Sequence, residues 1–234
     1  MAQSSVRSLK DDPKRIQGPT VKILVGMSKK PSHVHESILC SSSPFFKKAM
    51  SGPWKESAEH TIELPEDDPD MFDMYSHWLY YATIPVIVEG TASDESTKVL
   101  SQEYYDLAKA YVLGDKLLDV KFQNCVIDAI VERHATPDKR NGRCYIPNKK
   151  TINYAFDNTT ESAPIRKLLV DMYMGNVTAE WLSKDLPPDF IFSVLKSVVE
   201  KTPVLSVLIN ASDYYMDPAM EKQSLKRKLS EIEL

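Results

Sequence analysis

Two short segments of this sequence pair a helix-capping side chain with a proline, and they constrain how the first half of the chain folds. Ser43 is followed by Pro44, and Asp68 is followed by Pro69. A serine or aspartate oxygen accepts a hydrogen bond from the free backbone N–H groups at a helix start. Proline fits the next position because its missing N–H is not needed there. Helices are therefore predicted to begin at Pro44 and Pro69, the first ending at Met50.

The hydrophobic pattern around these helices alternates in two places, as is typical of β-strands. Residues 21–25 place Val21, Ile23 and Val25 on one face, and residues 61–64 alternate again. A turn is predicted for residues 26–32, after which the chain becomes extended at residues 33–35. The first strand is therefore expected in a hairpin.

Helical spacing dominates the remainder of the first half. Residues 84–100 are rich in Ser, Thr and Glu and predict a loop. A helical pair is expected from Ser101, with Asp119 able to cap its second member. The predicted class is α/β (α+β), with short, mostly N-terminal strands flanked by clustered helices and followed by an all-helical C-terminal extension.

Changes in composition divide the chain into four parts. Residues 1–19 are polar and predict a flexible N-terminal arm, and residues 20–134 form the predicted mixed domain. Residues 135–150 are the best boundary candidate, because two prolines and an Asn-Gly pair interrupt the helical pattern. Residues 151–234 are predicted to be helical.

Prolines mark two helices in the C-terminal part. One is predicted to open at Pro164, and another follows Pro187 and Pro188. The apolar stripe expected on the second consists of Ile191, Val194, Leu195 and Val198.

Charge and composition exclude several classes of function. The formal net charge is −4, which provides no overall field toward nucleic acid or an anionic membrane. The N-terminal residues contain no apolar signal segment, and no apolar run approaches the roughly 18 residues of a membrane span. The 7 glycines are too scattered to form a phosphate-binding loop. We expect an intracellular protein, cytoplasmic or nuclear, with no cofactor and no direct contact to membrane or nucleic acid.

The stretch from His35 to Tyr80 resembles the core of a BTB/POZ domain. That family places a histidine after its second strand, then a short helix and a Ser-x-Phe-Phe helix. A Glu-Ser turn, an Ile-x-Leu strand, an acidic Asp-Asp-Pro cap and a helix ending near Trp-Leu-Tyr follow. Here the series consists of His35, Leu39, Ser43, Phe45, Phe46, Glu56, Ser57, Ile62, Leu64, Asp67, Asp68, Pro69, Phe72, Trp78, Leu79 and Tyr80.

The resemblance extends from about Val21 to Val131. The remainder resembles the helical tails of single-BTB proteins common in filamentous fungi. It implies a protein–protein interaction module, an adaptor or scaffold rather than an enzyme, for which no catalytic residue is predicted. A homodimer through the BTB domain is compatible with it, although the 19 polar residues ahead of the domain disfavour a strand-swapped form.

One short element suggests a more specific role. Trp54-Lys55-Glu56 resembles the hydrophobic-x-Glu element through which many BTB domains bind the Cullin-3 ubiquitin-ligase scaffold. Trp54 would enter a pocket of the partner and Glu56 would set the register, giving a Cullin-3 substrate adaptor. The other interpretation is that Trp54 covers the core of its own domain.

The alternative function is a BTB-type transcriptional or chromatin regulator that acts through oligomerisation without direct DNA contact. Corepressor-binding members of the family carry an Asp before the first strand and a basic residue after the histidine. This sequence has Gly18-Pro19-Thr20 and Glu36 in those places, which weakens that role.

Other chemical sites are disfavoured. His33 and His35 share a strand face near Cys40 but lack an evident fourth zinc ligand, so no metal site is predicted. Cys40 and Cys125 lie in apolar surroundings and are interpreted as buried thiols rather than nucleophiles. The acidic run around Asp68 is explained by helix capping.

Overall fold

The computed structural model describes residues 16–52, 55–87, 96–138, 141–174 and 183–201. Those up to Val198 lie in one compact unit, and residues 199–201 belong to a second. Most of the predicted N-terminal arm lies outside the described residues. None of the described helices combines the length and apolar character needed to cross a membrane.

The sheet has three strands in the order β2-β1-β3, comprising β1 (Thr20–Val25), β2 (Lys30–His35) and β3 (Thr61–Leu64). β1 is antiparallel to β2 and parallel to β3. The alternation predicted for β1 is confirmed, since Val21, Ile23 and Val25 are buried. The predicted turn at residues 26–32 is too long, because β2 already begins at Lys30.

The two cap-plus-proline pairs begin helices as predicted. Ser43 Oγ accepts the backbone N–H of Phe46 at 3.2 Å, and an oxygen of Asp68 accepts that of Asp70 at 3.0 Å. One short helix in this region was not predicted, since only a turn was expected around Glu56. The helices here are α1 (Glu36–Ser42), α2 (Pro44–Met50), α3 (Lys55–Glu59) and α4 (Pro69–Tyr81).

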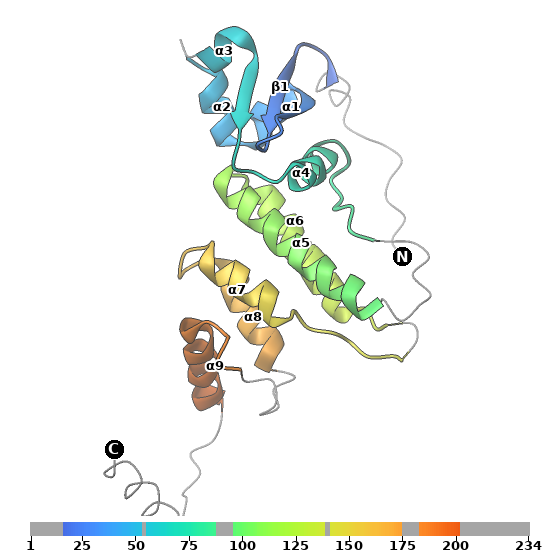
Figure 1. Ribbon diagram of the computed structural model, residues 1–234, viewed down its shortest axis with the longest axis vertical. Coiled ribbons are helices and arrows are strands. Elements are labelled where there is room, and N and C mark those ends of the chain that lie inside the picture. The colour runs from blue at the N-terminus through green and yellow to red at the C-terminus, as the bar shows by residue number, and fades with distance from the viewer. Residues whose placement is uncertain (1–15, 53–54, 88–95, 139–140, 175–182, 202–234) are drawn as a thin grey trace, which may run out of the picture. The chain divides into compact units, whose positions relative to one another are not determined.

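A long helical hairpin follows, formed by α5 (Ser96–Lys116) and α6 (Val120–Ala135), which lie side by side in Figure 1. The prediction of a loop up to residue 100 is wrong at its end, because α5 begins five residues earlier than expected. Asp119 caps α6 as predicted. A Cβ at Gly114 would lie 2.9 Å from side-chain atoms of Phe122 and Gln123, so glycine allows α5 and α6 to pack closely.

Three helices follow: α7 (Lys149–Asp157), α8 (Pro164–Met174) and α9 (Pro188–Lys201). The prediction at Pro164 is confirmed. Helix α7 lies mostly in the region expected to be helical but was not predicted as a separate element. The expected stripe of α9 is partly wrong: Phe190 and Val194 are buried, but Leu195 is 58% exposed. Phe190 faces this core because its ring contacts Phe156 and Tyr173, with ring centroids 5.4 Å and 5.0 Å apart.

Helix α5 connects the two halves, because it packs against α4, α6 and α7. The segment after α6 also contacts it, since Tyr104 Oη donates to the Tyr145 carbonyl at 2.8 Å. The described residues between 151 and 198 therefore pack in the same compact unit as the sheet. The four-part division at residues 19, 134 and 150 stays a prediction.

A buried carboxylate joins three parts of this fold. Asp119 is completely buried. One of its oxygens accepts hydrogen bonds from Ser42 Oγ at 2.5 Å and Tyr75 Oη at 2.9 Å, and the other accepts the Phe122 N–H at 3.0 Å. Burial and the neighbouring carboxylate raise the pKa of Tyr75, so its hydroxyl remains a donor. We call Asp119, Ser42, Ser43 and Tyr75 the polar junction.

Replacement of the junction carboxylate is expected to destabilise the protein strongly. Asp119→Ala removes the α6 cap and leaves the Tyr75 hydroxyl without its buried acceptor. The two effects together should lower the free energy of unfolding by about 2–4 kcal/mol. Urea denaturation followed by circular dichroism measures the change. The exposed Asp128 on the same helix is the control, and a similar loss for Asp128→Ala would contradict this explanation.

Candidate protein-binding groove

The sheet and the helices beside it enclose an open groove of about 700 Å³. Apolar side chains from α2 and β3, among them Phe45, Ala49 and Ile62, line it together with Leu118 from the turn between α5 and α6. A volume of this order is typical of sites that bind ligands. The groove combines an apolar surface with an opening to solvent.

The α2 side of the groove is held in place by Ser43. Its hydroxyl donates to the carbonyl of Leu117 at 2.6 Å and accepts the Phe46 N–H that begins α2. The buried Phe46 ring stacks on Tyr75, with centroids 6.5 Å apart, and leaves its neighbour Phe45 half-buried at the groove. The polar junction thus fixes α2 relative to the turn that carries Leu118.

Leu118 occupies a backbone position that normally favours glycine. Helix α5 ends with the N–H of Asp119 bonded to the Gly114 carbonyl and that of Leu118 bonded to the Asp115 carbonyl. This is the Schellman arrangement, in which glycine usually occupies the left-handed position. Here that residue is Leu118, with φ of +56° and a side chain that is 57% exposed. A left-handed leucine costs roughly 1–2 kcal/mol.

Carboxylates dominate the charge around the groove. Glu56, Glu59 and Glu63 line it, and Lys48 is the cation among its lining residues. Glu63 also pairs with Lys29 at 3.0 Å, outside that lining. The groove therefore favours a partner that brings positive charge next to apolar side chains.

The structure describes one of the two residues predicted to contact a cullin. Glu56 is exposed, lies in α3 and lines the groove, whereas Trp54 lies outside the described residues. The sequence provided no indication of the groove itself. Leu118 was missed as well, although a helix end without glycine was a signal that could have identified it.

His35 has a structural role. The Tyr80 hydroxyl lies 2.7 Å from His35 Nδ1 and 3.1 Å from its backbone nitrogen. This contact fixes the end of β2 against α4. Within the described part of the chain, no group of three or more His, Cys, Asp or Glu side chains is placed to hold a metal ion.

The described cysteines do not have the environment of activated nucleophiles. Burial raises the pKa of the Cys40 and Cys125 thiols, so both are held protonated. Cys144 is exposed. The interpretation of Cys40 and Cys125 as buried thiols was too strong, because both are only partly covered.

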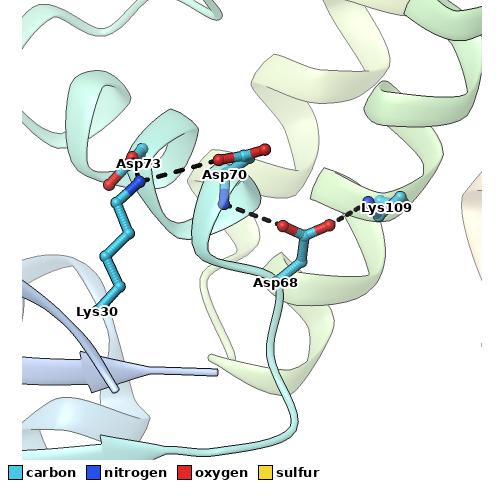
Figure 2. Close-up of polar contacts among 5 residues, drawn as sticks. All are labelled: Lys30, Asp68, Asp70, Asp73 and Lys109. Atoms are coloured by element: carbon cyan, nitrogen blue, oxygen red, sulfur yellow. Dashed lines mark hydrogen bonds and ion pairs between the residues drawn. The ribbon is translucent and has the colours of Figure 1, made fainter. Parts of the chain in front are cut away.

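Figure 2 shows how the acidic run around α4 is used. Asp68 caps the helix and also accepts a hydrogen bond from the Lys109 ammonium of α5, while Lys30 of β2 lies 2.8 Å from a carboxylate oxygen of Asp73. Burial alone would raise the pKa of Asp68, but Lys109 and the Asp70 N–H together lower it below its usual range. These acids hold β2 and α5 against α4.

The family comparison agrees with this architecture. A model of the BTB/POZ domain matches residues 13–107. The chain contains a BTB/POZ domain. The matched range includes the sheet, α1 to α4 and most of α5, and therefore every groove residue except Leu118. BTB/POZ domains are protein–protein interaction modules, so the groove belongs to a domain of that type.

The left-handed position of Leu118 generates a prediction that distinguishes it from its buried neighbour. Leu118→Gly relieves the backbone strain and removes an exposed side chain, but it gives the unfolded chain more freedom. We expect the free energy of unfolding to stay unchanged or to rise by up to about 1 kcal/mol. Leu117→Ala, at a completely buried position, should lower it by about 2–5 kcal/mol. A clear loss of stability in Leu118→Gly would show that its side chain packs in the fold.

The lowered pKa of Asp68 predicts a pH-dependent contribution to stability. Asp68→Asn keeps the cap but removes the charge that pairs with Lys109. At pH 7 the wild type should be more stable by up to about 1 kcal/mol, since the pair is partly exposed. The difference should be present above the usual aspartate pKa of about 3.9 and disappear as the pH falls through the lower folded-state value. Urea titrations of both proteins between pH 7 and pH 2 test this. A difference independent of pH would exclude the ion pair as its source.

Proposed function

We propose that the protein is an adaptor or scaffold that binds other proteins through the groove of its BTB/POZ domain. The observation that carries this proposal is Leu118. Leu118 is 57% exposed and so gains little from burial, and its left-handed backbone is strained. Such strain concentrates at functional sites. Contact with a partner would account for a leucine where glycine is the more stable choice.

The finer proposal is that this partner is the Cullin-3 ubiquitin-ligase scaffold. Support comes from the likeness of Trp54-Lys55-Glu56 to the hydrophobic-x-Glu element of cullin-binding BTB domains. It also comes from the exposure of Glu56 at the groove. An aromatic anchor and a carboxylate beside apolar groove residues would form a small central contact with a polar rim. Association of two copies through the BTB domain stays a prediction.

A binding experiment with the purified N-terminal part of Cullin-3 tests the finer proposal. Trp54→Ala combined with Glu56→Lys removes the anchor and reverses the charge, so affinity measured by calorimetry should fall by more than about tenfold. Leu118→Gly should also weaken binding without loss of stability. Circular dichroism and thermal unfolding of each variant establish that it is folded.

The control places the same charge reversal away from the groove. Glu161 is exposed in the connection between α7 and α8, and Glu161→Lys should bind like the wild type. A wild-type chain that does not bind the cullin would refute the cullin proposal. Unchanged binding by the Trp54 and Glu56 double variant would refute the assigned contact.

A further inference from the structure

One edge of the small sheet carries backbone groups that no described strand pairs with. The sheet order places β3 at an edge, with β1 on its other side. The carbonyls of His60 and Leu64 accept hydrogen bonds from Lys22 and Gly26, both at 2.9 Å, so the even-numbered residues face β1. Because backbone groups alternate along a strand, the N–H and C=O groups of the intervening odd-numbered residues face away from the sheet.

This free edge borders the groove. Thr61, Ile62 and Glu63 of β3 line it on one side, and Phe45 and Ala49 of α2 contribute apolar atoms to its lining. An extended segment added next to β3 would therefore enter a space that already has an apolar surface. Its alternate side chains would point toward α2 and toward solvent, as in other cases where a peptide extends a sheet.

Proteins usually protect a sheet edge with charge, a short strand or a covering segment. β3 is short and carries Glu63, which accounts for resistance to uncontrolled pairing. Protection of the edge against pairing does not explain the groove of about 700 Å³ beside it. It also does not explain the strained Leu118 that lines this groove. Both features are explained if the edge is reserved for one specific segment.

The lining charges select the chemistry of that segment. Among the described lining residues, three glutamates outnumber one lysine, so an acidic peptide is repelled and a basic one is attracted. A strand with basic side chains on one face and apolar side chains on the other matches both properties. A purely apolar strand would not use the attraction that the acidic lining offers to positive charge.

We propose that the groove binds an extended, alternating basic and apolar segment of a partner protein as an added strand on the free edge of β3. This inference deepens the proposed interaction role and rests on it, but it does not depend on the partner being a cullin. Main-chain hydrogen bonds to Thr61 and Glu63 provide the register, while Phe45 and Leu118 contact the apolar side chains.

The test uses a set of fluorescein-labelled eight-residue peptides that alternate Lys or Arg with Val, Leu or Phe. Fluorescence anisotropy against the full chain should show saturable binding for members of the set, and at least about tenfold weaker binding when Glu replaces the basic residues. Failure of every peptide to bind would overturn the proposal.

Strand addition is distinguished from other binding by N-methylation. In an extended peptide, every second N–H group would face β3. These N–H groups belong either to all the basic positions or to all the apolar positions. Methylating the backbone nitrogens of that one set must therefore block the pairing. One of the two methylated versions should lose at least about tenfold in affinity, and the other should lose much less. Equal affinity for both versions and the parent peptide would show that the segment does not bind as a strand.

A matched pair of variants locates the edge. Glu63→Gln and Glu63→Pro both remove the carboxylate and its pairing with Lys29, but only proline removes the outward N–H, a substitution that edge strands tolerate. Glu63→Pro should bind the peptide at least about tenfold more weakly than Glu63→Gln. Amide hydrogen exchange of the wild type provides a readout that needs no variant, since peptide should slow exchange at Thr61 and Glu63. Unchanged exchange at both amides would overturn the proposal.

The outcomes separate this inference from the cullin proposal and from a second copy of the chain. Peptide binding through β3 without cullin binding refutes the cullin alone, while the reverse result refutes strand addition alone. A third outcome is that the free chain is a dimer and that no peptide binds. If Glu63→Pro then converts the dimer to a monomer while Glu63→Gln does not, the edge belongs to a second copy. That result would overturn the proposed occupant.

Discussion

The fold depends on one buried carboxylate whose described partners are hydrogen-bond donors rather than a cation. Asp119 accepts hydrogen bonds from the hydroxyls of Ser42 and Tyr75 and from the Phe122 N–H in the first turn of α6. These groups come from the end of α1, the middle of α4 and the start of α6. A buried charge without such donors would be strongly unfavourable, so the three helices must meet with their donors aligned. The junction therefore specifies their arrangement more strictly than the surrounding aromatic packing does.

The junction also explains how a strained turn persists at the groove. Leu118 lies between Leu117, whose carbonyl accepts the Ser43 hydroxyl, and Asp119, whose carboxylate anchors the junction. Both neighbours are completely buried, so the backbone between them has no freedom to relax. The strain at Leu118 is thus offset by bonds on either side, and its side chain is held out toward the groove. A flexible loop would present the same leucine without fixing its position.

The sequence-based predictions were most accurate for elements that depend on interactions between residues close together in the chain. Ser43, Asp68 and Asp119 each cap a helix within a few residues, and all three helix starts were identified correctly. The start of α5 at Ser96 was missed, and α7 was expected only as part of a generally helical region. Asn148 caps α7 locally, but α7 packs against a distant part of the chain, α5. The face of α9 was partly wrong for the same reason, because Phe190 is buried by rings from α7 and α8. Glu56 could be proposed from a motif, but the groove could not, since α2, β3 and the α5–α6 turn meet only in the folded chain.

The position of α7 also shows how the helices after the BTB/POZ domain pack against it. Tyr105 of α5 contacts Tyr154 of α7, with ring centroids 5.3 Å apart, and Lys150 lies 3.7 Å from the centroid of the same Tyr105 ring. The buried side chains of both regions belong to one hydrophobic cluster. Helix α7 therefore completes the core next to α5. Since α5 ends in the turn that presents Leu118, loss of α7 would disturb the helix on which the groove depends. The packing of α7 and the geometry of the groove are therefore connected through this one helix.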